Sequence, residues 1–348
     1  MAPRGLGHLE HAGQFPNIHP AGPGREEAVV STGTTVATPA QATTATGAQK
    51  SDRSVAENRL GQKLVAPAVI LMLLVAGYPM FQAIYLSLYR YRLTTPGDRS
   101  FVGLSNYRVA LTDSLFWRDT WNTVVIMVVT VAIELVIGFV FAMVMHRIMI
   151  ARGLMRTAIL IPYGIVTVVS AFAWQFAFSL NNGWVNSWFH WLPWIGPETN
   201  WFGDHWHAMF AIMASEIWKT TPFMSLLLLA GLSQVSEDML EAAQVDGATW
   251  WQRLYKVILP NMRAAIMVAV LFRALDAFRI FDNIYIMTSG AQNTESSSFL
   301  TYRQTIQQMQ LGMGSALSVL LFLAVLLIAF LIVRLFRVDL ASARGEAR

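Results

Sequence analysis

The residues Glu241-Ala242-Ala243-Gln244-Val245-Asp246-Gly247-Ala248, followed by Leu259-Pro260, form a short amphipathic stretch between two long apolar runs, 209–232 and 260–287. At about 1.5 Å per residue, each flanking run is long enough to cross the ~30 Å hydrocarbon core of a bilayer as a helix. The stretch is therefore expected to form a hinge-like docking surface at a membrane face.

Helix-end signals predict the shape of this stretch. Ser236 is suited to cap a helix that ends at Asp246-Gly247, and its first turn has the acidic side chains that a helix N-terminus favours. Thr249 with Gln252 has the capping-box pattern, so a second helix is expected to begin at once. Pro260 ends that helix and is suited to open the next span. The prediction is a helix, a glycine turn, a second helix and a proline.

The composition is that of a polytopic membrane protein. Of 348 residues, 55% are hydrophobic and 13% are charged, and the mean hydropathy is +0.45, which is far more apolar than a soluble domain requires. The chain has no cysteine, which excludes disulfides and thiolate metal sites. Its net charge of +4 comes from short clusters beside apolar runs rather than from one basic stripe, so no nucleic-acid partner is expected.

The apolar runs predict an all-α fold with six transmembrane helices. A permease domain is expected over 61–337, with a cytoplasmic coupling loop over 233–259. Residues 1–60 are rich in Ala, Gly, Thr and Pro and are expected to be a disordered tail, and 338–348 form a second tail. The six predicted spans are residues 64–88, 123–145, 159–180, 209–232, 260–287 and 316–336.

The distribution of Lys and Arg predicts that both termini and the opening stretch are cytoplasmic. Basic residues flank the first span, the loop between spans two and three, the opening stretch and the C-terminal tail, which all lie on one side by parity. The loop between spans one and two opposes this bias with five arginines, whereas the outer loop 181–207 has no Lys or Arg. The summed bias favours the cytoplasm.

The outer loop 181–207 is rich in tryptophan. Trp184, Trp188, Trp191, Trp194, Trp201 and Trp206 are typical of an interfacial belt, because the indole ring is apolar and its N–H seeks water. A docking surface for a partner protein is the alternative. His205 and His207 lack a third ligand at a usable spacing, so no metal site is predicted.

Polar residues inside spans four and five predict a substrate pathway. A charge at the centre of a span costs about 2.5–3.5 kcal/mol, so it needs a partner or water. We expect a polar cavity that binds sugar hydroxyls, with an aromatic ring stacked on the sugar; the alternative is interhelical ion pairs, such as Lys219 with Asp276, that only hold the bundle together. Glu134 in span two is expected to make an interhelical hydrogen bond. The candidates are Glu216, Lys219, Thr220, Phe223, Asp276, Phe278, Arg279, Asp282 and Asn283.

These residues resemble a known family. Glu241-Ala242-Ala243, Gly247 four residues later and Leu259-Pro260 are similar to the EAA loop of permease subunits of binding-protein-dependent ABC importers. Residues 101–107, 218–224 and 276–282 are similar to stretches of the carbohydrate-uptake subfamily, which includes maltose, glycerol-phosphate and trehalose permeases. The resemblance covers residues 60–337. It departs from the subfamily in the long N-terminal tail and at 289–291, where a Gly-Gly-Gly-Pro-like turn is frequent.

The resemblance implies a subunit without catalytic residues, located in a bacterial inner membrane. Its implied partners are a second permease of different sequence, a cytoplasmic ATPase dimer that binds ATP and Mg, an extracytoplasmic sugar-binding protein, lipid and a sugar such as trehalose. No cofactor is expected on this chain, which lacks a phosphate-binding loop. The residues implied to couple to the ATPase are Glu241, Ala242, Ala243, Asp246, Gly247, Ala248, Leu259 and Pro260.

Two other classes of protein remain open from the residues alone. An ion-gradient-driven secondary carrier would use the intramembrane carboxylates as proton relays, but six spans without an obvious inverted repeat do not favour it. A polytopic membrane enzyme would need a cluster of acidic or His residues at an interface, for which 204–207 is too small.

Overall fold

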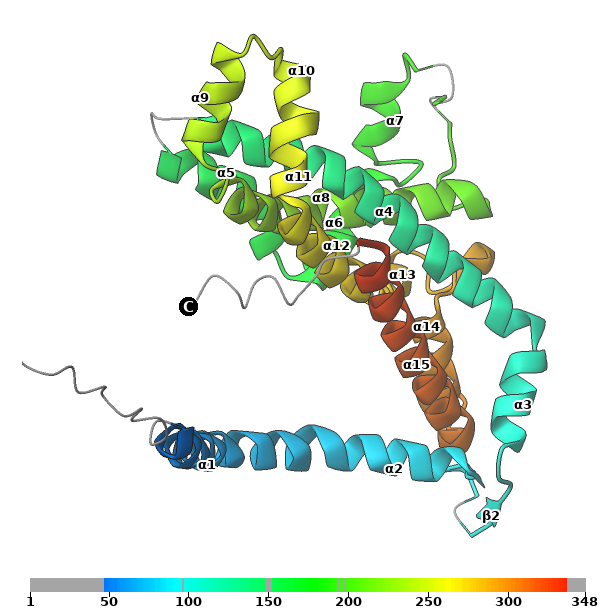
Figure 1. Ribbon diagram of the computed structural model, residues 1–348. Coiled ribbons are helices and arrows are strands. Elements are labelled where there is room, and N and C mark those ends of the chain that lie inside the picture. The colour runs from blue at the N-terminus through cyan, green and yellow to red at the C-terminus, as the bar shows by residue number, and fades with distance from the viewer. Residues whose placement is uncertain (1–46, 96, 148–151, 193–194, 197, 337–348) are drawn as a thin grey trace, which may run out of the picture. The chain divides into compact units, whose positions relative to one another are not determined.

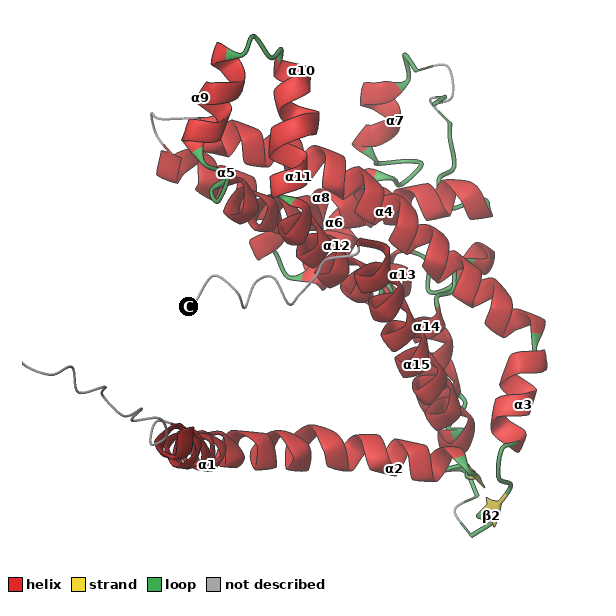
Figure 2. Ribbon diagram, in the orientation of Figure 1, coloured by secondary structure: helices red, strands yellow, loops and turns green. Residues whose placement is uncertain are grey.

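The computed structural model describes residues 47–95, 97–147, 152–192, 195–196 and 198–336. Regular structure in this part of the chain is almost entirely helical (Figure 2). Its sheet is a single pair of two-residue antiparallel strands, β1 (Tyr89–Arg90) and β2 (Ser100–Phe101). The predicted all-α class is therefore confirmed. Residues 338–348 of the predicted C-terminal tail lie outside the described residues.

The chain divides into two compact units, 1–66 and 67–348. Helix α1 (Gly47–Met72) continues through a π-helical segment, Leu73–Gly77, into α2 (Tyr78–Ser87). We expected residues 47–60 to belong to a disordered tail, but α1 includes them. Their Ala, Gln, Glu and Arg residues are good helix formers, so the polar segment extends the apolar helix that follows it. Residues 1–46 of the predicted tail lie outside the described residues.

Helices α4 (Ser114–Arg147) and α8 (His205–Leu232) form the centre of the second unit and pack along their length (Figure 1). Close packing requires a glycine at Gly138, where an added Cβ would lie 3.0 Å from Met224 Cγ and 3.2 Å from the Ser225 backbone nitrogen. The short helix α3 (Ser105–Thr112) precedes α4. Helices α4 and α8 form the scaffold that holds the buried polar side chains Glu134 and Glu216.

The predicted span 159–180 is broken. It consists of α5 (Arg152–Gly164) and α6 (Thr167–Ala177), which meet at an angle of 86°. Pro162 lies inside α5, where it lacks the N–H of a helical hydrogen bond, and Gly164 ends that helix. The short helix α7 (Trp184–Phe189) then lies in the tryptophan-rich loop before α8.

The predicted span 260–287 is also broken, so the prediction of a continuous helix there is wrong. The backbone passes from α11 (Leu259–Asn261) into α12 (Arg263–Ala277), leaves helical geometry at residues 278–281 and resumes in α13 (Asp282–Met287). Non-helical backbone at membrane depth is stable where it lines a polar cavity rather than lipid, and the break does so here. By length and composition, three helical segments of the described residues can cross a membrane: 60–87, 114–147 and 311–336. The number rises to five if two bent pairs, α5 with α6 and α8 with the helix over 237–245, each form one span. The predicted six are therefore not all single straight helices.

The chain after α13 returns along α4. A 3-10 turn, Ala291–Asn293, leads to α14 (Ser297–Tyr302), a π-helical segment, Arg303–Gln307, and the last span, α15 (Leu311–Phe336). Asn122 on α4 donates hydrogen bonds of 2.7 and 3.0 Å to the backbone oxygens of Asn293 and Glu295. The Glu295 side chain pairs with Arg118 and Arg303. These contacts fasten the returning segment to the start of α4.

Candidate functional site

A polar cavity of about 430 Å³ lies beside α8, where the α12–α13 break faces α5 and α6. The break presents several side chains together because its backbone leaves the regular helix. The cavity is lined by Tyr163, Thr167, Glu216, Lys219, Thr220, Asp276, Arg279, Ile280, Phe281, Asp282 and Asn283. Seven of the nine predicted pathway residues therefore line one space, although they come from α8, α12, the break after α12, and α13.

Behind the cavity, Arg273 of α12 is fully buried and binds three carboxylates. Its Nε lies 2.6 Å from Glu134 Oε2, and its Nη2 lies 3.0 Å from Glu134 Oε1 and 3.3 Å from Glu216 Oε1. Its Nη1 donates to Asp276. A guanidinium with five donors in a plane suits this arrangement, which a lysine could not reproduce. Arg273 therefore joins α4, α8 and α12 through one buried cation.

The carboxylates of this network make further hydrogen bonds. Thr220 Oγ1 donates to Glu134 Oε1 at 2.8 Å, and Asn283 Nδ2 donates to Glu216 Oε2 at 2.7 Å. The expected structural role of Glu134 as an interhelical hydrogen-bonding group is confirmed. Glu216 both belongs to the network and lines the cavity, so network and cavity share a wall.

The ion pair between Lys219 and Asp276, which was the alternative to a substrate pathway, is not formed. Asp276 pairs with Arg273 instead, and among the described residues no carboxylate lies within ion-pair distance of Lys219. The Lys219 Nζ lies 5.6 Å from the centre of the Tyr163 ring, a cation–π contact. Lys219 is thus a buried cation at the cavity wall without a carboxylate partner in this part of the chain.

Neither phenylalanine predicted to stack on a sugar lines the cavity. Phe223 stacks on Tyr163, with ring centres 5.3 Å apart, and does not line the cavity. Phe278 is 2% exposed and faces a small apolar space beside Leu317 of α15. The rings at the cavity are Tyr163 and Phe281, which sequence reasoning missed because it assumed straight spans; the helix-breaking Pro162 was the available signal for Tyr163.

The opening stretch folds as predicted into α9 (Glu237–Val245) and α10 (Trp250–Arg253), joined by a turn. The Thr249–Gln252 capping box is present with both of its hydrogen bonds. Gly247 has φ +75°, a left-handed conformation that favours glycine, and an added Cβ would meet nothing within 4 Å. The residues from 250 then continue through a π-helical segment, Leu254–Ile258, into α11, so Pro260 lies within a nearly continuous helical run rather than at a sharp stop.

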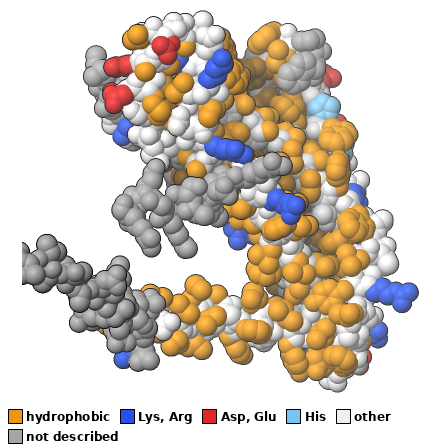
Figure 3. All heavy atoms as spheres, viewed as in Figure 1, with side chains coloured by type: hydrophobic (Ala, Val, Ile, Leu, Met, Phe, Trp, Pro, Cys, Tyr) orange, Lys and Arg blue, Asp and Glu red, His pale blue; other side chains and the backbone are white. Residues whose placement is uncertain are grey.

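This α9–α10 hairpin has a surface that is both acidic and apolar. None of the α9 residues is buried, and acidic side chains gather on α9 in the space-filling view (Figure 3). Val245 is 88% exposed and Trp251 is 61% exposed. Of the predicted coupling residues, Glu241, Ala242, Asp246, Gly247 and Pro260 are exposed, and Ala243, Ala248 and Leu259 are partly buried. Exposed apolar groups rimmed by charge are typical of a protein-docking surface.

The outer loop does not form a uniform tryptophan belt. Trp188 and Trp191 are exposed, whereas Trp201 is 2% exposed and donates to Asn186 Oδ1 at 2.6 Å. Trp201 is therefore a core residue, because Asn186 satisfies its indole N–H in the interior. Trp194 lies outside the described residues.

The two histidines of this loop have other hydrogen-bonding roles. Asp204 caps α8, and hydrogen bonds from the His207 ring and from backbone N–H groups hold the pKa of Asp204 below its ordinary value. His205 Nδ1 lies 3.1 Å from the Gln292 backbone oxygen. Across the described residues, no group of three or more His, Cys, Asp or Glu residues is placed to hold a metal ion.

The chain is similar in sequence to known proteins. A family model described as "Binding-protein-dependent transport system inner membrane component" matches residues 134–339. The chain is 50% identical over 293 residues to the trehalose transport system permease protein SugA of Mycobacterium tuberculosis, covering 84% of this chain and 92% of that protein. It is 36% identical over 287 residues to the trehalose/maltose transport system permease protein MalF of Thermococcus litoralis, covering 81% and 96%.

A solved structure has the same fold. It is a bacterial alginate ABC transporter in complex with alginate pentasaccharide-bound periplasmic protein, which matches with a TM-score of 0.69 and 19% identity over 82% of this chain and 96% of the other.

Proposed function

The chain belongs to the family of binding-protein-dependent transport system inner membrane components, and we propose that it forms half of the pore of an ATP-driven sugar importer. This membership agrees with the resemblance drawn from the EAA loop and makes the chain a transport subunit of an inner membrane rather than an enzyme. The observation that supports sugar import most directly is that one pair of helices joins the docking hairpin to the polar cavity. Helix α8 ends at the hairpin and α12 begins after it, and both helices line the cavity.

The hairpin is the proposed contact with a cytoplasmic ATPase subunit. Its exposed Val245 and Trp251 suit an apolar cleft, and Glu241 offers a carboxylate for a charge-assisted hydrogen bond. ATP and Mg are bound by that partner in this proposal, and this chain holds no cofactor. Movement of the hairpin would reach the cavity through α12, because Arg273 on that helix binds Glu216 of α8.

The cavity is the proposed sugar site. Carboxylates of Asp276 and Asp282 accept hydrogen bonds from hydroxyl groups, and the rings of Tyr163 and Phe281 offer apolar faces to a pyranose. A disaccharide is the proposed class of substrate. Trehalose is the first candidate, since it is named for relatives that are 50% and 36% identical to this chain.

The remaining partners follow from the same proposal. A second permease, of a different sequence, closes the other side of the pore, and an extracytoplasmic binding protein delivers the sugar. Both termini and the hairpin are placed in the cytoplasm, as the distribution of Lys and Arg indicates. The alternative carrier driven by an ion gradient would need no hairpin exposed for an ATPase.

The test is reconstitution of the chain with its co-expressed partners in vesicles. We expect trehalose, presented by the binding protein, to stimulate ATP hydrolysis and to accumulate inside only when ATP is supplied. Uptake that persists under an ion gradient without ATP would contradict the importer. Stimulation by another sugar but not by trehalose would retain the importer and replace its substrate.

A further inference from the structure

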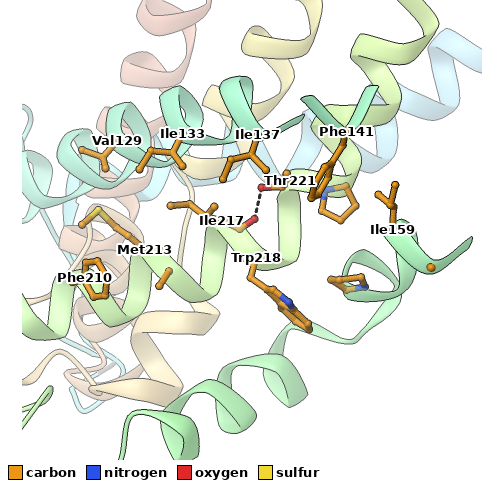
Figure 4. A pocket seen from close by; sticks show the side chains of 14 residues that line it. Val129, Ile133, Ile137, Phe141, Ile159, Phe210, Met213, Ile217, Trp218 and Thr221 are labelled. Atoms are coloured by element: carbon orange, nitrogen blue, oxygen red, sulfur yellow. Dashed lines mark hydrogen bonds between the residues drawn. The ribbon is translucent and has the colours of Figure 1, made fainter. Parts of the chain in front are cut away.

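A large apolar groove lies on the other side of α8 from the polar cavity (Figure 4). Its volume is about 670 Å³, larger than that of the cavity. Val129, Ile133, Ile137 and Phe141, spaced four residues apart, form the α4 wall, and α5 and α8 form the other two walls. The groove therefore lies among three helices of the membrane domain.

Helix α8 separates the groove from the cavity by its register. Ile217 and Thr221, four residues apart, face the groove, whereas Glu216 and Lys219 face the cavity. Helix α5 divides in the same way, since Pro162 lines the groove and its neighbour Tyr163 lines the cavity. A single layer of helix thus forms the wall between a polar space and an apolar one.

The groove offers no polar group to a ligand in its depth. The hydroxyl of Thr221 already donates to the Ile217 backbone oxygen at 2.6 Å, the bond drawn in Figure 4. Trp218 is 40% exposed, which leaves its ring available at the side of the groove. Apolar cavities of this kind do not hold ordered water, because water needs polar partners. The chemistry of the lining fits hydrocarbon and does not fit a sugar.

The charge at the cytoplasmic end of the groove indicates which kind of lipid would bind there. Residues 135–197 contain no Asp or Glu, but they contain Arg147, Arg152 and Arg156. Arg147 ends α4 one to two turns after Phe141, and Arg156 lies on α5 just before the groove residue Ala158. Both arginines are exposed, and within the described residues neither pairs with a carboxylate. Basic residues at the cytoplasmic end of an intramembrane groove attract anionic lipid headgroups.

We propose that this groove binds an anionic phospholipid, with an acyl chain against α4, α5 and α8 and the phosphate near Arg147 and Arg156. The choice of lipid over a second permease rests on the proposed function. If the partner permease closes the cavity, it lies on the opposite side of α8 from the groove, so the groove faces the bilayer. The bound chain then supports the thin wall of α5 and α8 that positions Tyr163 and Lys219.

The first experiment measures the lipid that remains bound. The chain with its co-expressed partners is incorporated in vesicles of equal phosphatidylglycerol and phosphatidylcholine, extracted in mild detergent and examined by native mass spectrometry. We expect wild-type complex to retain phosphatidylglycerol and Ala214→Phe, which fills the groove, to lose it. The matched control is Leu327→Phe on the exposed face of α15, which should retain the lipid.

A second pair of variants tests the headgroup without altering the packed helices. Arg156→Gln and Arg147→Gln should each lower the preference for phosphatidylglycerol over phosphatidylcholine by about fivefold. Arg263→Gln is the control, because Arg263 is an exposed arginine at the start of α12 and does not line the groove. Equal preference in all three variants and wild type would overturn the headgroup assignment.

A photoreactive residue at Ile217 identifies the occupant directly. Crosslinks to phospholipid support the proposal, whereas crosslinks to the second permease or to another segment of this chain overturn it. Equal lipid retention by wild type and Ala214→Phe also overturns it. None of these readouts requires ATP hydrolysis or sugar uptake, so failure of the lipid site and failure of the importer proposal are separable.

Discussion

The network around Arg273 and the α9–α10 hairpin use charged residues in opposite ways. Arg273 is fully buried, and its three carboxylate partners come from α4, α8 and its own helix. The charged residues of α9 are exposed, and the hydrogen bond that Arg253 donates to Gln244 at 3.1 Å stays within the hairpin. One region is completed by this chain, and the other is left to be completed by a partner.

The difference separates stability from function. Removing one member of a buried ion network leaves unpaired charges inside the protein, which is strongly destabilising. Changing an exposed hairpin leaves the packed helices unaltered, so its consequence should appear only when the partner docks. Substitutions in the two regions should therefore differ in whether the folded chain survives.

The largest effect is expected for Arg273→Met. Methionine keeps much of the volume but leaves Glu134 and Glu216 buried without their cation, at a cost of about 3–5 kcal/mol in the free energy of unfolding. Chemical denaturation of the purified chain in detergent measures this loss. A loss in the free energy of unfolding of only about 1 kcal/mol, which is ordinary for a single substitution, would contradict the stabilising role of the network.

Two controls assign that loss to the unpaired carboxylates. Arg279→Met removes an exposed arginine that lies six residues after Arg273, in the break that follows α12, and should change the free energy by less than about 0.5 kcal/mol. Arg273→Met combined with Glu134→Leu removes the most deeply buried carboxylate as well, so it should be less destabilised than Arg273→Met alone.

Gly247→Trp should have the next largest effect. This effect should appear in uptake, because the strain it adds is confined to the exposed turn. A bulky residue at φ +75° strains the turn by about 1–2 kcal/mol and blocks the close approach of a partner. Sugar uptake in vesicles should fall by more than about tenfold, while the chain remains folded in the membrane. Glu241→Lys should act in the same direction by reversing the charge offered to the ATPase.

Gly247→Asn is the matched control for the turn. Asparagine tolerates the left-handed conformation and is small, so uptake should stay within about twofold of wild type. Loss of uptake in Gly247→Asn would show that backbone strain, rather than partner docking, explains the tryptophan variant.

The hairpin was predictable from the sequence because its signals are local. Gly247 and the Thr249–Gln252 capping box act within one or two turns. Helix α9 begins after Ser236 as predicted, although the Ser236 side chain makes no capping hydrogen bond. Contacts between residues on different helices of the bundle were harder to predict from the sequence. An ion pair between Lys219 and Asp276 was the alternative to a substrate pathway, but the buried guanidinium of Arg273 takes that carboxylate instead.

The broken spans explain most of the remaining differences. A hydropathy pattern detects apolar length, but it does not show that a helix leaves regular geometry at 278–281, so Phe278 was placed at the cavity in the position that Phe281 occupies. Five charged or amide side chains within 273–283 were a signal of a break, because a continuous lipid-facing helix could not accommodate them.

Asp276→Ala and Arg279→Ala test the cavity beside the Arg273 network. We expect their effect on transport to be smaller than that of Gly247→Trp. Both side chains line the cavity and are exposed to it, and in Asp276→Ala the buried Arg273 keeps Glu134 and Glu216 as carboxylate partners. Loss of one charge-assisted hydrogen bond to a sugar hydroxyl should raise the KM for sugar-stimulated ATP hydrolysis by about tenfold, with ATPase subunits still bound. An unchanged KM in both variants would show that these residues have a structural role only and do not bind the sugar.

Lys219→Met should have a much smaller effect on stability than Arg273→Met, although Lys219 is nearly as buried as Arg273. The two cations differ in their partners, because Arg273 neutralises carboxylates and Lys219 meets the Tyr163 ring. Losing that cation–π contact costs about 1 kcal/mol or less, and the buried methionine offsets part of this cost. The free energy of unfolding should therefore stay within about 1 kcal/mol of wild type, while the KM for sugar rises several-fold. A loss as large as that of Arg273→Met would mean that Lys219 also neutralises the buried carboxylates, and the contrast between paired and unpaired cations would fail.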